Sequence, residues 1–150
     1  MASWKAAYGG LLPAKKLAQL DVNEHEGAWL KRLRHAEEVG LRTWVALLEE
    51  RVVGFAFTQP SADDDLESDV HELTALYLLP SVWRTGIGTA LLIAVEAELK
   101  DAGIRNLALW VLKGNEGAKR FYEARGWSFE KRDPSFKDFG AAALRYRKSL

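Results

Sequence analysis

The sequence of 150 residues contains no cysteine, four prolines and one methionine. Without cysteine, the chain forms no disulfide and offers neither a thiolate metal ligand nor a cysteine nucleophile. The longest uncharged runs, such as Thr85–Val95, contain about eleven residues, whereas a membrane-spanning helix needs roughly 18 or more. Gly9, Gly10 and Pro13 stand where a signal peptide would have its apolar stretch. These absences predict a cytoplasmic protein without a membrane segment.

A charge excess of either sign is also missing, because 21 Lys and Arg residues balance 21 Asp and Glu residues. Nucleic-acid-binding proteins normally have a basic excess, so the neutral total argues against a nucleic-acid partner. The balance is uneven along the chain, with 8 basic and 13 acidic residues in positions 1–75 and 13 basic and 8 acidic in positions 76–150. Either these are ordinary solvated faces, or the second half binds an anion and the first half faces a cationic molecule.

Size and composition predict a single domain over residues 1–150. Apolar residues make up 48% and charged residues 28% of the chain, as in ordinary globular proteins. A chain of this length buries about two thirds of its unfolded surface around one core.

The periodicity of apolar residues predicts both helices and strands. Helices are expected at Ser3–Tyr8, Ala14–Leu20, Glu24–Val39, Gly86–Ala102 and Glu116–Arg125. Strands are expected at Thr43–Leu48, Val52–Thr58, Glu72–Leu79, Asn106–Leu112, Trp127–Glu130 and Ala143–Arg147. The strand, helix and strand within residues 72–112 require a parallel pair with a right-handed crossover. The fold class is therefore mixed α/β or α+β with one layered core.

An acidic segment separates two of these strands and contains Asp63, Asp64, Asp65, Glu67 and Asp69. Its position after Pro60 predicts a loop. Such a loop either attracts a cationic molecule, such as a polyamine, an aminoglycoside or a basic peptide, or is simply solvated.

A glycine-rich turn, Trp83-Arg84-Thr85-Gly86-Ile87-Gly88-Thr89-Ala90, connects a predicted strand to a predicted helix. Its backbone N–H groups and the positive end of the helix dipole favour an anion such as a phosphate. The turn lacks the Lys-Ser/Thr pair of a P-loop after its second glycine. It also has Leu91 where a dinucleotide fingerprint needs Gly or Ala. Taken alone, the turn is either a phosphate site of another class or a tight connection.

A second pattern, N-x-x-A-x-x-F-Y-x-x-x-G-W, runs from Asn115 to Trp127, about thirty residues after P-x-x-W-R-x-G-I-G-x-A-L-L. Together the two motifs resemble the GNAT superfamily of acetyl-CoA-dependent N-acetyltransferases. The likeness is most specific over residues 72–131 and looser over residues 8–58, where Tyr8–Pro13 and Val53–Phe55 also resemble family members. It implies a GNAT-like acyl-CoA N-acyltransferase fold, a mostly antiparallel sheet with one parallel pair and flanking helices, with acetyl-CoA as cosubstrate and no metal.

The resemblance also implies where coenzyme A binds. Main-chain groups would bind the pantetheine arm at Leu76, Tyr77 and Leu78. Backbone amides would hold the pyrophosphate at Arg84, Thr85, Gly86, Ile87, Gly88 and Thr89. Family members usually have Gln or Arg where this chain has Trp83, which removes one polar contact. Asn115 matches an asparagine that contacts the pantetheine region, and it is also expected to cap the following helix.

Two residues match catalytic positions of the family. Tyr122 matches a tyrosine near the thioester sulfur, where a phenol can protonate the departing thiolate; the alternative is packing beside Phe121. Glu72 lies eleven residues before Trp83, at the place of the catalytic glutamate of some members, and burial would make its carboxylate a stronger base. His71 is the competing base, and many members use water and backbone instead. Adjacent strand residues face opposite sides, so only one of the two can face the cleft.

We therefore expect an N-acetyltransferase that moves the acetyl group of acetyl-CoA to a primary amine by direct attack in a ternary complex. The acceptor is expected to be a small-molecule amine or a protein amine, without nucleic-acid or membrane partners. The alternatives are a non-catalytic acyl-CoA-binding sensor or regulatory domain and a plain nucleotide-phosphate binder. Family members usually begin with a strand and a longer helix before the Tyr8–Pro13 stretch. Without that first strand, an open sheet edge would favour a homodimer.

Overall fold

The computed structural model describes Ala6, Leu11, Ala36 and residues 40–134 and 141–150. Its strands are β1 (Arg42–Leu48), β2 (Arg51–Pro60), β3 (Val70–Leu78), β4 (Asn106–Leu112), β5 (Ser128–Asp133) and β6 (Ala143–Ser149). Its helices are the 3-10 helix η1 (Pro80–Val82), α4 (Ile87–Asp101) and α5 (Glu116–Glu123). The helices predicted at Ser3–Tyr8, Ala14–Leu20 and Glu24–Val39 lie outside the described residues, apart from Ala6 and Ala36.

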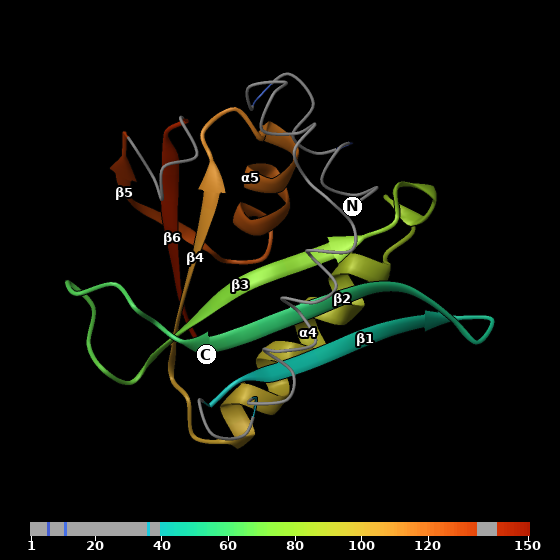
Figure 1. Cartoon of the computed structure of the whole chain (residues 1–150), viewed down its shortest axis with the longest axis horizontal. Coiled ribbons are helices and arrows are strands. Elements are labelled where there is room, and N and C mark those ends of the chain that lie inside the picture. Colours follow the sequence, from blue (N-terminus) through green and yellow to red (C-terminus); the bar gives the residue numbers. More distant parts are fainter. Residues whose placement is uncertain (1–5, 7–10, 12–35, 37–39, 135–140) are drawn as a thin grey trace.

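The described strands form one six-stranded sheet with the order β1-β2-β3-β4-β6-β5. β3 and β4 are parallel and are joined by α4, while the other neighbouring pairs are antiparallel. The predicted mixed sheet with one parallel pair is thus confirmed. Figure 1 shows α4 behind β1, β2 and β3, and α5 beside β4.

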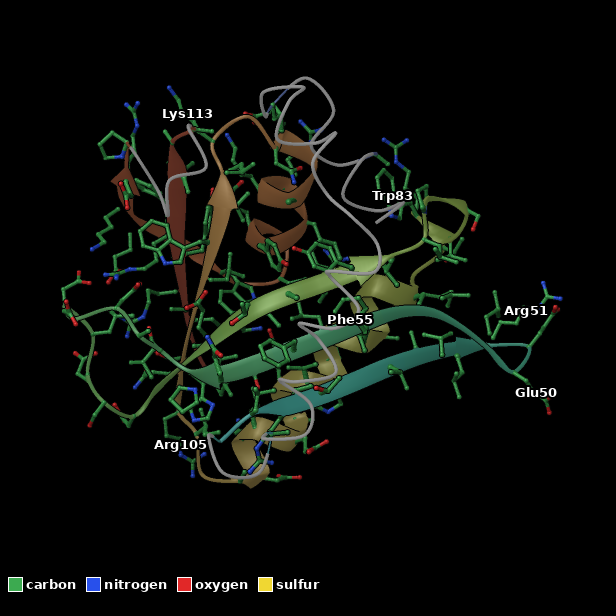
Figure 2. The ribbon with its side chains drawn as sticks, viewed as in Figure 1. Glu50, Arg51, Phe55, Trp83, Arg105 and Lys113 are labelled. Carbon is green, nitrogen blue, oxygen red and sulfur yellow. The ribbon has the colours of Figure 1, made fainter. Side chains whose placement is uncertain are left out.

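The predicted hairpin between the first two described strands is confirmed. Leu48 faces Arg51, so Glu49 and Glu50 form a two-residue turn. Both turn residues have positive φ angles, 48° and 63°, the conformation that such a turn requires at both central positions. Figure 2 shows Glu50 and Arg51 at the tip of the hairpin, projecting away from the rest of the sheet.

The main core lies between the sheet and the two helices. α4 contributes Leu91, Leu92, Val95 and Leu99 at helical spacing, and the sheet contributes side chains such as Leu107 and Leu109. A smaller cluster of Leu41, Phe57 and Ala75 lies on the opposite face of the sheet. β4 has three consecutive buried residues, Leu107, Ala108 and Leu109, as expected for a strand that is covered on both faces.

The acidic loop is fixed by a buried arginine. Arg145 of β6 is 2% exposed, and its guanidinium donates hydrogen bonds to Asp63 at 2.9 Å and to Asp65 at 2.7 and 2.8 Å. A third carboxylate, Glu130 of β5, also accepts a hydrogen bond from Arg145. We call these four residues the Arg145 cluster. The loop is therefore not simply solvated, because two of its carboxylates are bound to the sheet.

The Arg145 cluster changes the electrostatics of the loop. Hydrogen bonds from Arg145 and then Lys131 hold the pKa of Asp65 well below its usual range. The Lys131 ammonium lies 2.6 Å from an Asp65 carboxylate oxygen. Asp65 thus stays ionised at any ordinary pH, and its carboxylate forms ion pairs with Arg145 and Lys131.

Within the part of the chain that the structure describes, no helix is long and apolar enough to cross a membrane.

Candidate active site

The sheet opens between its two central strands. β3 and β4 are paired only at Val70–Asn106, His71–Leu107 and Glu72–Ala108. Beyond Glu72, β3 remains paired with β2 as far as Leu78, and β4 remains paired with β6 as far as Leu112. Figure 1 shows the two strands spreading apart in this direction. We call the opening, bordered by residues 73–78 of β3 and 109–112 of β4, the fork.

The predicted pantetheine-binding positions border the fork. Leu76, Tyr77 and Leu78 pair on their other side with Ala56, Phe55 and Gly54 of β2. In a strand paired on one edge, half of the backbone polar groups point to the other edge. The fork side of β3 therefore presents the main-chain groups that an extended ligand arm needs.

The glycine-rich turn bends tightly from η1 into α4. Arg84 and Gly86 have positive φ angles of 62° and 91°, and the Thr85 hydroxyl donates a 2.7 Å hydrogen bond to the Val82 carbonyl. Gly86 is the N-cap residue, and no side chain of the described residues caps α4. The first amides of α4 thus remain directed outward at the positive end of the helix dipole, as an anion site requires.

Trp83 stands where the family usually has a polar residue, and it has a local role. Its indole nitrogen donates a 3.0 Å hydrogen bond to the carbonyl of Leu78. The side chain is 42% exposed and lies beside the turn that precedes α4 (Figure 2). Trp83 therefore binds the end of β3 to the turn in place of offering a contact to a phosphate.

Gly88 brings the start of α4 against the fork. A Cβ atom added to Gly88 would lie 2.9 Å from Leu78 Cδ1 and 3.5 Å from Phe121 Cε2. Glycine therefore permits β3, α4 and α5 to meet closely at this point. The predicted pyrophosphate site and the predicted pantetheine site are contiguous because of this contact.

Arg125, which the sequence reasoning missed, joins the two helices. Its Nε donates a 3.2 Å hydrogen bond to Thr89 Oγ1 of α4, and its Nη1 donates one of 2.6 Å to the Phe121 carbonyl. The guanidinium carbon also lies 3.9 Å from the centroid of the Phe121 ring. The Thr89 hydroxyl is thus bound to Arg125. The predicted role of Thr89 in the pyrophosphate site requires only its backbone amide.

A second set of bonds fixes the segment after α5. Lys148 of β6 donates to Glu96 of α4 at 2.6 Å and to the Arg125 carbonyl at 2.8 Å. The indole of Trp127 donates to the same Glu96 at 3.1 Å. The two helices that border the fork are therefore held to each other and to the sheet by charged and polar contacts.

The helix residues of the second motif have clear structural contacts. Asn115 caps α5, because its Oδ1 accepts a 3.1 Å hydrogen bond from the Ala118 amide. Tyr122 is 8% exposed, and its ring centroid lies 5.2 Å from that of Phe121 and 5.7 Å from that of Trp127. The predicted cap is confirmed, and the packing of Tyr122 beside Phe121 is present. The ligand contacts expected for both residues remain predictions.

The two candidate bases lie at the base of the fork. Glu72 is 3% exposed and belongs to the last β3–β4 pair. His71 precedes it in a regular register, so the two side chains start from opposite faces. Burial, followed by the charge of Arg42, lowers the pKa of His71 below its usual value, which keeps the imidazole neutral. The positions of both residues beside the opening are compatible with Glu72 as the predicted base and with His71 as the competing base.

One further feature of β3 was absent from the sequence reasoning. Phe57 pairs with Ala75 while the next residue, Thr58, pairs with Leu73. Thr74 is therefore the extra residue of a β-bulge, two positions beyond the base of the fork. No simple sequence pattern marks this bulge, because Thr is common in regular strands.

Comparison with known proteins agrees with this geometry. The Acetyltransferase (GNAT) family model matches residues 10–127. The chain is 31% identical over 124 residues to the uncharacterized N-acetyltransferase YuaI of Bacillus subtilis, covering 81% of this chain and 66% of the relative. It is 38% identical over 77 residues to an uncharacterized N-acetyltransferase of Mycobacterium tuberculosis, covering 51% of this chain and 46% of that protein. The matched segments thus span less than two thirds of these relatives.

Solved structures share the fold. The PaiA N-acetyltransferase of Thermoplasma acidophilum, crystallised with coenzyme A, superimposes with a TM-score of 0.80 at 22% identity, covering 99% of this chain and 87% of that chain. A GNAT family acetyltransferase of Elizabethkingia anophelis with acetyl-CoA bound gives a TM-score of 0.66 at 17% identity, with coverages of 80% and 82%. Both likenesses establish the fold. Together with the family match over most of its length, they show that the chain belongs to the GNAT acetyltransferase family.

Proposed function

We propose that the protein transfers the acetyl group of acetyl-CoA to a primary amine by direct attack in a ternary complex. The observation that carries this proposal is the fork, whose open β3 edge ends where Leu78 approaches Gly88 at the start of α4. An open strand edge followed by a helix N-terminus suits a ligand with an extended amide-containing arm and a pyrophosphate. Coenzyme A has both parts.

The residues of this region fit acetyl-CoA as cosubstrate. Backbone groups of Leu76, Tyr77 and Leu78 would bind the pantetheine arm, and Asn115 would contact it from α5. Backbone amides would hold the pyrophosphate at Arg84, Thr85, Gly86, Ile87, Gly88 and Thr89. A Cβ atom at Gly88 would enter the space between Leu78 and Phe121, so glycine keeps the cradle close to the fork.

The chemistry requires one base and one acid. Glu72 accepts the proton that the amine loses, so that the nitrogen lone pair attacks the thioester carbon and a C–N bond forms. The C–S bond then breaks, and Tyr122 donates its phenolic proton to the departing thiolate. The second proton, which the nitrogen loses on becoming an amide, returns through solvent to the Tyr122 phenolate. This assignment is supported by the position of Glu72 at the base of the fork and of Tyr122 on the helix beside it. Because the chain has no cysteine, an acyl-cysteine intermediate is excluded.

The acceptor is proposed to be a small-molecule amine or a protein amine. Two carboxylates of the acidic loop are bound to Arg145, so the loop offers less free negative charge than its composition suggests. A panel of acceptors therefore needs compounds of different charge. It would contain a polyamine, an aminoglycoside, a basic peptide and a neutral alkylamine with one ammonium group.

The proposal is tested by following the release of coenzyme A thiol from acetyl-CoA with each acceptor. We expect turnover with at least one amine, and calorimetric binding of acetyl-CoA without any acceptor. Tyr122→Phe should lower kcat by about 100- to 10,000-fold, the usual range for loss of a general acid, with little change in the Kd of acetyl-CoA. Binding without turnover across the panel would instead favour the non-catalytic acyl-CoA-binding domain. An unchanged kcat for the variant would remove Tyr122 from its role.

A further inference from the structure

Arg125 is a half-buried cation beside the proposed pyrophosphate site. Its guanidinium donates hydrogen bonds to the Thr89 hydroxyl and to the Phe121 carbonyl, and it lies over the Phe121 ring. No carboxylate of the described residues forms an ion pair with it, whereas Arg145 and Lys148 are each paired with one or more. Charges that are withdrawn from water are usually paired. Within the described residues, the positive charge of Arg125 is thus balanced by no negative charge.

The hydrogen bonds from Arg125 also fix the Thr89 hydroxyl. A hydroxyl accepts up to two hydrogen bonds and donates one. Arg125 occupies both accepting positions, because its Nε, at 3.2 Å, and its Nη2 donate to the same Thr89 Oγ1. The proton of the hydroxyl must therefore point away from the guanidinium. None of the residues that the structure describes accepts this proton.

The position of Thr89 in α4 indicates what the proton meets. Thr89 is the third residue of the helix, and side chains in a helix lean toward its N-terminus. The hydroxyl therefore lies in the first turn, together with the backbone amides that have no partner within the helix. The hydroxyl proton, these amides, the helix dipole and the charge of Arg125 all favour the same kind of group, which is a phosphate oxygen.

We propose that Arg125 is a positioning residue of the pyrophosphate site, where it holds the Thr89 hydroxyl so that the hydroxyl donates its proton to a phosphate oxygen. This inference rests on the proposed function, because it assumes that coenzyme A lies along the fork. The guanidinium polarises the hydroxyl to which it donates, so the hydroxyl becomes a stronger donor. Arg125 thus contributes to the affinity for the coenzyme and acts on it through Thr89.

The test is a double-mutant cycle in which calorimetry gives the Kd of coenzyme A. Thr89→Val removes the hydroxyl and keeps a branched side chain, and Arg125→Met removes the guanidinium and keeps a long one. We expect each variant to raise the Kd by about 10- to 100-fold, the usual value of one hydrogen bond to a charged group. The double variant should lose no more affinity than Arg125→Met alone, because both residues act through one hydrogen bond. Thr89→Ser, which keeps the hydroxyl, should retain most of the affinity.

Lys148→Met is the matched control for a purely structural effect. Lys148 also joins α4 to the segment after α5, through Glu96 and the Arg125 carbonyl, but Glu96 lies nine positions after Ile87, the first residue of α4. We expect Lys148→Met to lower the Tm, because it leaves Glu96 without its cation, and to leave the Kd of coenzyme A unchanged. Dephospho-coenzyme A, which keeps the pyrophosphate and lacks the 3′-phosphate, should lose as much affinity for Arg125→Met as coenzyme A does.

The outcomes separate the two proposals. An unchanged Kd for Arg125→Met, additive losses in the double variant, or an equal loss for Lys148→Met overturns the role of Arg125 and leaves the proposed function intact. A loss for Arg125→Met that is seen with coenzyme A alone also overturns it, because the contact would then lie at the 3′-phosphate. Failure of the unaltered protein to bind coenzyme A overturns the proposed function itself. If Arg125→Met does not fold, Arg125→Lys takes its place in the cycle, since lysine keeps the charge without the paired N–H groups.

Discussion

At the scale of single residues, Arg145 is a buried cation whose charge is balanced by carboxylates of the acidic loop and of β5. Its guanidinium is 2% exposed and binds carboxylates from the acidic loop and from β5. It also lies 5.5 Å from the centroid of the Trp110 ring, and the Trp110 indole donates a 2.9 Å hydrogen bond to Asp63. The cluster therefore fixes a loop that the apolar core does not reach.

We predict that Arg145→Met lowers the free energy of unfolding by about 2–4 kcal/mol, because it removes the buried member of the cluster. Lys131→Met is the matched control. Lys131 contributes a more exposed ion pair to the same Asp65, so its loss should cost about 1 kcal/mol or less. Urea unfolding measures both effects. Equal losses for the two variants would contradict the central role of Arg145.

The stabilisation that the Arg145 cluster provides should also depend on pH, and the direction of this dependence follows from the pKa of Asp65. The folded-state pKa of Asp65 lies below the ordinary value of 3.8. Its contribution to stability is therefore complete above about pH 4 and is lost as the pH falls further toward the folded-state pKa. The difference in stability between the unaltered protein and Arg145→Met should accordingly narrow below pH 4. A difference that stays constant into strong acid would argue against the ion pair as its source.

At the scale of elements, the approach of β2 to the end of β3 depends on Gly54. A Cβ atom at this position would lie 2.6 Å from the Tyr77 carbonyl oxygen and 2.4 Å from Leu78 Cδ2. Gly54 faces Leu78 in the register, so the crowding would fall on the strand that borders the fork.

We predict that Gly54→Ala lowers the free energy of unfolding by about 1–3 kcal/mol, as overpacking against backbone usually does. It should also weaken coenzyme binding, because Tyr77 and Leu78 would shift. Gly117→Ala in α5 is the control, since its Cβ atom would have Asn115 Oδ1 at 3.8 Å as its nearest neighbour. An alanine inside a helix is expected to stabilise by about 0.5–1 kcal/mol. Thermal unfolding should thus move in opposite directions for the two variants.

The elements differ in how well the sequence predicts them. The bounds of β4 agree with the prediction, and α4 begins and ends within one residue of it, because apolar periodicity is strong in buried elements. β5 extends to Asp133 where Glu130 was predicted. This edge strand is polar and largely exposed, so its sequence lacks the alternation of apolar and polar residues that predicts a strand. α5 ends at Glu123, two residues before the predicted end.

The candidate site divides in the same way. The glycine-rich turn, Asn115 and Tyr122 follow from motifs that are contiguous in sequence. The Thr89–Arg125 contact joins residues 36 positions apart, and the Arg145 contacts span 80 and 82 positions. Nothing local marks such pairs, because either partner alone resembles an ordinary surface residue. The bulge at Thr74 was equally hidden, since it depends on the neighbouring strand.

At the scale of the whole molecule, β1 is an edge strand of the described sheet. Val45 and Leu47 of this strand are 55% and 63% exposed. An antiparallel pairing of two copies about Ala46 would place Val45 opposite Leu47 of the second copy. These exposed apolar residues would then find apolar partners, and we propose this pairing for the homodimer expected from the sequence.

We predict a concentration-dependent dimer in sedimentation experiments, which Leu47→Lys should shift toward the monomer by placing like charges near the symmetry axis. Ile93→Lys is the control, because Ile93 is 59% exposed and belongs to α4 rather than to β1. A monomer at all concentrations, or equal effects of the two variants, would exclude pairing through β1.

The fork also affects how the sequence can change over time. Its β3 border offers main-chain N–H and C=O groups, which every residue except proline provides in the same form. Substitutions along Leu76–Leu78 can therefore alter the side chains without altering the hydrogen bonds offered there. The hydrogen bonds that this part of the site offers therefore depend on the backbone conformation of β3 more than on the identity of its residues. Distant relatives can thus keep one binding mode while their sequences diverge.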